Sequence, residues 1–329
     1  MRALRNANPP DLKAAVAIAQ QARRDGQAAV MAGGGSDVLG MMKERLITPD
    51  VVVNLRAIKG LDRITGDGRA LTIGGLAPLD AIARHPEIRR QHRVLAEAAE
   101  SVATPQIRNV ATVAGNVCQR PWCWYYRNGF HCFKAGGNVC YSVSGENQFH
   151  AIFGGGPSHI VHPSDTAPAL VALGARFRIV GPSGERTVAA ADFFTLPTVN
   201  AARENVLKED EVLADISVPA APETRRSTYH KVMDREAWTH AVVSAAIVLD
   251  INKDVCQHAR IVLGGVAPIP WRLPEVERLI EGQRMTPALA EKAGEAAVAG
   301  ARPLAKNGYK VPLTRALVKR TLESLAGSA

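Results

Sequence analysis

The sequence lacks the long apolar segments of a membrane or secreted protein. No uninterrupted apolar run in the 329 residues reaches the roughly 20 residues needed to span a bilayer. The first residues lead from Met1 directly into Asn8-Pro9-Pro10, and no apolar signal-peptide core follows them. We therefore expect a cytoplasmic protein with no membrane span, unless a partner that carries a signal exports the folded chain.

The sequence also lacks a basic block of the kind that binds nucleic acid. Lysine and arginine number 40 and aspartate and glutamate 31, which gives a net charge of +9, but the excess is spread along the chain. A nucleic-acid surface would favour a tighter basic patch. We expect no nucleic-acid partner, and an anionic cofactor or an acidic partner subunit would suit the charge equally well.

What is present predicts an α+β protein of two domains, because 329 residues exceed what one small core organises. Pro219-Ala-Ala-Pro222 resembles a linker, so we place the domain boundary after residue 221. Residues 104–165 show no clear hydrophobic periodicity and are therefore expected to form a loop. A loop of this length inside a compact domain is usually functional. Hydrophobic periodicity predicts the following elements: strands at 28–32, 51–54, 70–73, 176–180, 212–218, 241–251 and 259–266, and helices at 9–26, from Pro78, and at 91–101, 166–174, 273–281, 286–300 and 313–325.

A glycine-rich loop follows the first long strand. Gly33-Gly34-Gly35-Ser36-Asp37 lies between that strand and a short helix, where backbone N–H groups can converge on an anion. An ordinary tight turn with Ser36 as helix cap explains the same residues. The loop lacks the third glycine of a dinucleotide-binding Rossmann turn and the lysine of a P-loop. If it binds a dinucleotide, the fold is a different one.

A second glycine-containing loop and an isolated aspartate lie downstream in the sequence. The loop is Arg108-Asn-Val-Ala-Thr-Val-Ala-Gly-Asn116, and His162-Pro-Ser164-Asp165 precedes an apolar helix. Two such loops with one aspartate can hold a long ligand at several points.

With Ala32-Gly-Gly-Gly-Ser-Asp37 and Tyr229-His-Lys231, these motifs resemble the FAD-binding subunit of the xanthine dehydrogenase, carbon monoxide dehydrogenase and aldehyde oxidoreductase family. The resemblance runs nearly end to end. It implies a two-lobed FAD-binding domain of the vanillyl-alcohol-oxidase type at 1–221, with lobes of about 1–55 and 56–221. A smaller α+β domain would occupy 222–329.

The resemblance also implies which residues hold FAD. Residues 31–38 would wrap the pyrophosphate, Thr112, Gly115 and Asn116 would form the second flavin loop, and Lys231 would lie near the flavin ring. From the residue types alone, Asp165 could equally cap the following helix and Lys231 could be a solvated strand residue. The full set expected at FAD is Met31, Ala32, Gly33, Gly34, Gly35, Ser36, Asp37, Val38, Val102, Arg108, Asn109, Thr112, Gly115, Asn116, Asp165, Leu213 and Lys231.

Four of the five cysteines gather in the long loop. The spacing Cys118-x4-Cys123-x8-Cys132-x7-Cys140 contains no C-x2-C pair, so zinc is weakly supported. Without a secretion signal, clustered cysteines favour a metal over disulfides, and four thiolates suit a [4Fe–4S] cluster. Cys256 stands alone in a strand-like segment and is expected to be a buried core thiol.

The insertion at about 117–160 resembles that of a subgroup that includes 4-hydroxybenzoyl-CoA reductase and periplasmic aldehyde oxidoreductase, whose flavin subunits carry a [4Fe–4S] cluster. Cys123, Cys132 and Cys140 match three of the family's ligands, but the fourth family cysteine falls at Ser158. We favour Cys118 as the replacement ligand. The alternatives are His159, an altered or absent cluster, and a Cys118 that packs as a small buried hydrophobe.

The resemblance predicts an electron relay with FAD and no catalytic residue of its own. A large molybdenum-cofactor subunit and a small [2Fe–2S] subunit would be the partners, and an external acceptor would receive the electrons. The complex would oxidise an aldehyde, a purine or another aromatic substrate, or reduce an aromatic thioester. Lys231 would stabilise reduced flavin, so Lys231→Ala should lower the flavin potential. The alternatives are a self-sufficient flavin oxidoreductase of the same fold and a non-enzymatic metal or nucleic-acid module.

Overall fold

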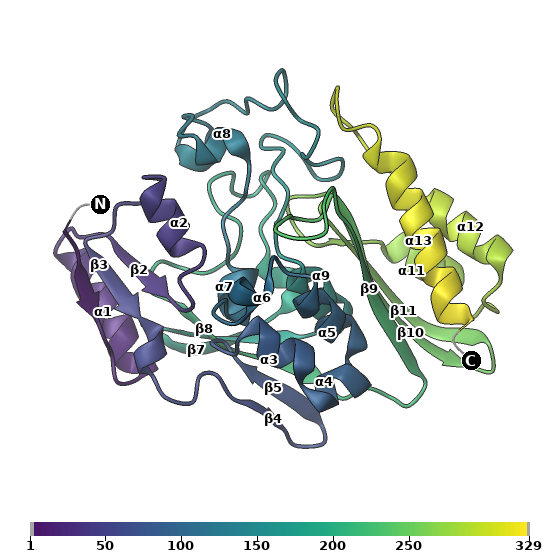
Figure 1. Ribbon diagram of the computed structural model, residues 1–329, viewed down its shortest axis with the longest axis horizontal. Coiled ribbons are helices and arrows are strands. Elements are labelled where there is room, and N and C mark those ends of the chain that lie inside the picture. The colour runs from purple at the N-terminus through teal and green to yellow at the C-terminus, as the bar shows by residue number, and fades with distance from the viewer. Residues whose placement is uncertain (1–2, 328–329) are drawn as a thin grey trace.

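The computed structural model describes residues 3–327, and the first of its three sheets has three parallel strands in the order β1-β3-β2 (Figure 1). Helix α1 begins after Asp11, whose carboxylate accepts a hydrogen bond from the N–H of Ala14 at 2.7 Å. Its small apolar residues recur at helical spacing and are buried against the sheet. The elements of this lobe are β1 (Arg5–Ala7), α1 (Leu12–Arg24), β2 (Ala29–Ala32), α2 (Val38–Lys43), β3 (Val51–Asn54) and the 3₁₀ turn Leu55–Ala57.

The second sheet has five antiparallel strands in the order β4-β5-β8-β6-β7. Short helices cover it, and their buried side chains form the largest apolar core of the molecule. The strands are β4 (Ile64–Gly66), β5 (Ala70–Gly74), β6 (Arg176–Gly181), β7 (Gly184–Ala189) and β8 (Val212–Pro219). The helices are α3 (Leu79–Arg84), α4 (Pro86–Gln91), α5 (Arg93–Glu100), α6 (Pro105–Arg108), α7 (Val113–Val117), α9 (Thr166–Ala172) and α10 (Ala190–Phe193).

The third sheet is antiparallel in the order β12-β11-β10-β9 and is covered on both faces. Side chains alternate along its central strand: Ala246 and Val248 pack into the core of the second sheet, and Ile247 and Leu249 pack against the C-terminal helices. Because both faces are buried, the strand is almost continuously apolar. The elements are β9 (Arg225–Val232), β10 (Val243–Asn252), β11 (Val255–Gly264), β12 (Trp271–Arg272), α11 (Pro274–Ile280), α12 (Pro287–Ala296) and α13 (Lys310–Ala326).

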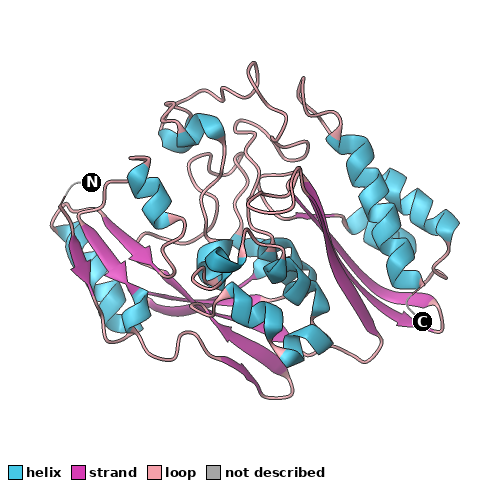
Figure 2. Ribbon diagram, in the orientation of Figure 1, coloured by secondary structure: helices cyan, strands magenta, loops and turns pink. Residues whose placement is uncertain are grey.

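The segment 117–160, named here the cysteine insertion, is mostly loop (Figure 2). It contains only the short helix α8 (Trp124–Arg127) and the 3₁₀ turn Phe133–Ala135. Ion pairs join it to Asp37 and Glu44, which flank α2, on one side and to Lys306, before α13, on the other. The insertion therefore connects the N-terminal lobe to the C-terminal helices.

Most predicted elements are present, and the α+β class is confirmed. Strand β11 begins at Val255, four residues before the predicted start, and β7 was not predicted because none of its residues is buried and they show no apolar alternation. The strands β1, β4, β9 and β12 were missed as well. The boundary expected after residue 221 falls in the turn between β8 and β9 and stays a prediction. Within residues 3–327, no helix combines the length and apolarity needed to cross a bilayer.

Candidate functional site

The two glycine-bearing loops lie directly against each other. A Cβ added to Gly34 would lie 1.9 Å from the carbonyl oxygen of Val110, and one added to Gly33 would lie 2.9 Å from Oγ1 of Thr112. Real Cβ atoms do not approach other atoms so closely, so the contact requires glycine at both positions. Segments about 75 residues apart in the chain thus lie side by side and form one cradle, whose role in binding FAD stays a prediction. Such a cradle fits a phosphate-containing ligand.

Ser36 does not cap the helix that follows the glycine loop. The N-cap residue of α2 is Asp37, and its side chain makes no capping bond. The carboxylate of Asp37 instead accepts hydrogen bonds from the guanidinium of Arg127 at 2.8 Å and from the N–H of Arg120 at 3.0 Å. Ser36 and Asp37 do form the expected turn, but the expected cap by Ser36 is wrong.

The second loop is held by its own polar side chains. Thr112 caps α7 by accepting a hydrogen bond from the N–H of Gly115, at 3.2 Å. The side-chain oxygen of buried Asn116 accepts hydrogen bonds from the hydroxyls of Ser164 and Thr166, both at 2.6 Å. Asn116 therefore fastens this loop to the segment that ends at Asp165.

The remaining expected FAD residues border the same loop. Arg108 donates to the carbonyl oxygen of buried Val102 at 2.9 Å, and Asn109 is exposed at the end of α6. Leu213 is buried in β8, and its carbonyl would lie 2.5 Å from a Cβ at Gly75, so the backbones pass closely there. The assignment of individual residues to FAD stays a prediction.

Asp165 and Lys231 form a buried ion pair. Their charged atoms are 2.7 Å apart, and the side chains are only 5% and 2% exposed. The hydroxyl of Tyr229 donates to the second carboxylate oxygen at 2.7 Å, and burial with the neighbouring carboxylate raises the pKa of Tyr229 well above its usual range. Asp165 makes no capping bond to α9, and Lys231 is not solvated. Both alternatives from the residue types are therefore wrong.

The structure separates Cys118 from the other clustered cysteines. Cys118 ends α7 and packs against the core of the second sheet, and burial raises the pKa of its thiol to about 12. Cys132 and Cys140 lie near Cys123 instead, and after burial their charges also raise the pKa of the Cys123 thiol. We find no contact in the described residues that supports Cys118 as a ligand beside these three thiols. The alternative, in which Cys118 packs as a small buried hydrophobe, agrees with its surroundings.

Two histidines accompany the three grouped thiols. Nε2 of buried His150 lies 3.3 Å from Sγ of Cys123, and the N–H of His159 donates to Sγ of Cys140 at 3.5 Å. Burial raises the pKa of Cys123 to about 11, whereas at Cys140 hydrogen bonds from His159 and Ser142 outweigh burial and lower the pKa to about 7. Within the described residues, no three histidine, cysteine or acidic side chains are arranged around one metal position.

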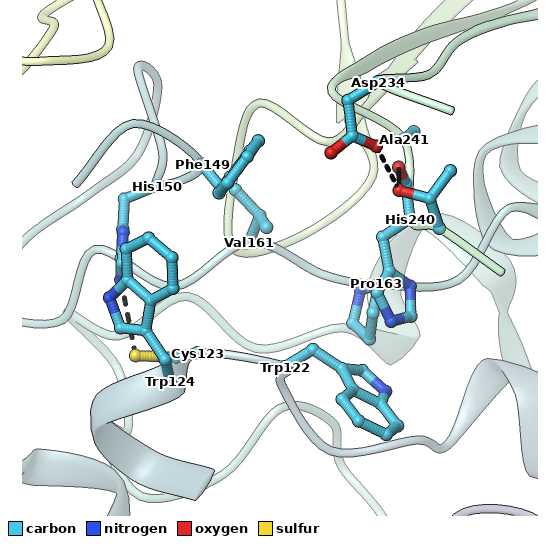
Figure 3. Close-up of a pocket in the computed structure, with 11 residues that line it drawn as sticks. Trp122, Cys123, Trp124, Phe149, His150, Val161, Pro163, Asp234, His240 and Ala241 are labelled. Atoms are coloured by element: carbon cyan, nitrogen blue, oxygen red, sulfur yellow. Dashed lines mark hydrogen bonds between the residues drawn. The ribbon is translucent and has the colours of Figure 1, made fainter. Parts of the chain in front are cut away.

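A small cavity of about 160 Å³ lies between the cysteine insertion and the loop from β9 to β10 (Figure 3). Trp122, Trp124 and Phe149 line it with Cys123 and His150 from the insertion. Its other side is formed by the 234–241 segment, next to the Asp165–Lys231 pair. The aromatic lining keeps much of the surroundings of Cys123 apolar.

The family was tested by comparison with known proteins. Residues 3–221 match the family model described as the FAD binding domain in molybdopterin dehydrogenase, and residues 228–325 match the CO dehydrogenase flavoprotein C-terminal domain. The chain belongs to this flavoprotein family. The aldehyde oxidoreductase FAD-binding subunit PaoB of Escherichia coli is 33% identical over 302 residues, which cover 90% of each chain.

Carbon monoxide dehydrogenase of Hydrogenophaga pseudoflava is similar to this chain both in sequence and in structure. The carbon monoxide dehydrogenase medium chain of Hydrogenophaga pseudoflava is 27% identical over 96% of this chain and 94% of its own. A solved structure of carbon monoxide dehydrogenase from that organism superposes with a TM-score of 0.78 at 25% identity, covering 98% of this chain and 97% of the other. The predicted family, fold class and oxidoreductase type are thereby confirmed, and FAD is its cofactor.

Sequence reasoning missed the charged residues that hold the cysteine insertion in place. Lys134 and Arg120 both pair with buried Glu204, at 2.9 Å and 2.8 Å. Arg127 pairs with Asp37 and Glu44. The only signal was a set of cations within an aromatic stretch, which does not reveal partners about 70 to 90 residues away.

Proposed function

We propose that this flavoprotein family member is the electron-transfer subunit of a molybdenum hydroxylase complex and passes electrons between iron–sulfur clusters and an external acceptor. A large molybdenum-cofactor subunit and a small [2Fe–2S] subunit would be its partners. The similarity to subunits of aldehyde oxidoreductase and carbon monoxide dehydrogenase along almost the whole chain supports this proposal. The matched proteins are themselves named as subunits or medium chains, which favours a relay over a self-sufficient flavin oxidoreductase.

The observation that carries the proposal is the cradle formed by Gly33, Gly34 and the Val110–Thr112 backbone. We propose that the FAD pyrophosphate lies on this cradle and that the remaining expected residues border the cofactor. FAD, when bound, supplies the redox chemistry, and the protein supplies position and electrostatics. The chain's own side chains would bind and orient the cofactor, and none of them needs to act as a general acid or base.

Copurification tests the relay. The chain, tagged and purified from its native source, should be yellow and should bring molybdenum and two further chains with it. A colourless chain that does not bind added FAD would overturn the proposal. A yellow chain that oxidises a substrate by itself, without molybdenum, would favour the self-sufficient flavin oxidoreductase.

We also propose that the cysteine insertion carries a [4Fe–4S] cluster, as in the subgroup it resembles. Three cysteines in one insertion, with His150 beside Cys123 and the backbone N–H of His159 beside Cys140, support this, because soft thiolates are the usual ligands of such clusters. In the described residues these side chains do not converge on one metal position, so the cluster would have to draw them together. Nδ1 of His150 and Nδ1 of His159 are both buried without a hydrogen-bond partner. Since Cys118 packs elsewhere, we propose that one of these histidines completes the ligand set. No substrate of the complex follows from these residues.

Iron analysis distinguishes the ligand sets. The purified chain should contain about four irons with equal acid-labile sulfide, the content of one cubane cluster. His150→Ala or His159→Ala should reduce the iron content and change the electron paramagnetic resonance spectrum of the reduced cluster, whereas Cys118→Ala should leave both unchanged. An iron-free holo-flavoprotein would end the cluster proposal without affecting the FAD proposal.

A further inference from the structure

Arg127 of the cysteine insertion contacts the glycine loop through a buried network. Its guanidinium donates to Asp37 at 2.8 Å and to Glu44 at 3.2 Å, and it stacks over the ring of Trp122 at 4.2 Å. Further bonds to the carbonyl oxygens of Pro121, at 2.9 Å, and Arg120, at 3.1 Å, fix its orientation. The Arg127 side chain is only 6% exposed, whereas Glu44 is 34% exposed, so the contact with Asp37 is the better shielded of the two ion pairs.

We infer that Arg127 is a positioning residue for FAD, because it holds Asp37 in place and offsets its charge beside the bound pyrophosphate. This inference rests on the proposal that the glycine loop receives the pyrophosphate. Asp37 directly follows Ser36 in that loop, so its carboxylate lies close to the place of an anionic group. Like charges repel more strongly where solvent is partly excluded. Arg127 pairs with Asp37 and therefore offsets this repulsion.

The same contacts make FAD affinity depend on the cysteine insertion. Arg127 belongs to helix α8, which directly follows Cys123. The backbone N–H of Arg120, in the same insertion, also donates to Asp37. Any change that disorders the insertion would therefore release Asp37 from both partners. By thermodynamic linkage, bound FAD should in turn favour the ordered insertion.

Titration of the FAD-depleted, full-length chain with FAD tests the inference. Arg127→Met should raise the dissociation constant about tenfold to a hundredfold, the effect expected when a hydrogen bond between charged groups is lost. Lys306→Met is the control, because it removes a cation that pairs with Glu146 of the same insertion at the surface and has no contact with Asp37 or Arg127. Lys306→Met should bind FAD with nearly the wild-type dissociation constant.

A rescue experiment separates charge from simple loss of structure. Asp37→Asn in the Arg127→Met background should lower the dissociation constant again, because it removes the unpaired carboxylate. Unchanged affinity in Arg127→Met, equal loss in Lys306→Met, or no rescue by Asp37→Asn would each overturn the inference. Failure of the wild-type chain to bind FAD would instead overturn the proposed function.

Discussion

At the scale of single residues, the Asp165–Lys231 pair is the most sensitive point of the site. Lys231 donates to Asp165 and to the carbonyl oxygens of Ser101 and Thr239, so all three of its N–H donors are used. Lys231→Met should lower the free energy of unfolding by about 3–5 kcal/mol, because Asp165 would remain as a buried, unpaired charge. Urea unfolding measures this loss.

An exposed ion pair supplies the control for Lys231. Lys306 pairs with Glu146 at the surface, where both side chains are about half exposed, so Lys306→Met should cost about 1 kcal/mol or less. Equal losses in the two variants would contradict the burial argument. The expected fall in flavin potential on Lys231→Ala stays a prediction, and the pairing with Asp165 means that any effect on the flavin acts through the pair.

The sequence could indicate Asp165 and Lys231 only through the family resemblance. Their pairing joins residues 66 positions apart, which no local pattern reveals. Judged locally, an aspartate before a helix predicts a cap, and a lysine in a strand predicts exposure. Tertiary contacts overrode both local preferences, since the buried carboxylate needed a charged partner.

At the scale of elements, the close contact between the two glycine-bearing loops predicts that Gly34 cannot be replaced by a larger residue without loss of FAD. Gly34→Ala would place a Cβ 1.9 Å from the carbonyl oxygen of Val110, so the loops must separate and FAD should be lost. Gly40→Ala is the control: it lies in α2, has nothing within 4 Å of the added Cβ, and should stabilise the helix by up to about 1 kcal/mol. The flavin-to-protein absorbance ratio and thermal unfolding measure the two effects. A Gly34→Ala protein that keeps its FAD would contradict the proposed cradle.

The positions of the helices also explain why the prediction of four clustered cysteine ligands was only partly informative. Spacing placed four cysteines in one loop, but Cys118 belongs to the end of α7, which directs it into the core. Cys123, Cys132 and Cys140 lie beyond the helix, in the mostly irregular part of the insertion. Helix boundaries are the least certain part of a sequence-based prediction, and here one boundary decided the surroundings of a thiol.

At the scale of the whole molecule, the cysteine insertion joins the family's two domains. The N–H of Lys306 donates to the side chain of buried Asn147, and buried Asn307 donates to the carbonyl oxygens of His150 and Ala151. Family motifs predicted both domains along the chain. They could not predict these contacts, because the insertion and the C-terminal segment are about 160 residues apart in the sequence.

Lys310 lies at this junction and should make stability depend on pH. It is fully buried, donates to the carbonyl oxygens of Phe149 and Gly265, and its pKa is lowered by burial to about 7. An unfolded lysine titrates near 10.4. Between these pH values the unfolded chain binds a proton that the folded chain does not, so the Lys310 contribution to the unfolding free energy rises with pH, by up to about 1.4 kcal/mol per unit. Below pH 7 both states are protonated, and the full cost of burying the charge remains.

Lys310→Met should remove this dependence. The unfolding free energy of the wild type minus that of Lys310→Met should increase from pH 7 to pH 10, as measured by urea unfolding at several pH values. Lys310→Met also loses the hydrogen bonds to the two carbonyl oxygens. This loss changes the difference in unfolding free energy by the same amount at every pH, so it does not change the slope of that difference with pH. Neighbouring His150 stays neutral over this range, because burial and nearby Lys310 lower its pKa to about 4. Lys319 on the same helix is the control: Glu291 raises its pKa, so Lys319→Met should show no such increase. A flat difference for Lys310→Met would mean that Lys310 is charged in the folded protein throughout, and that its contacts with the insertion persist unchanged into alkaline solution.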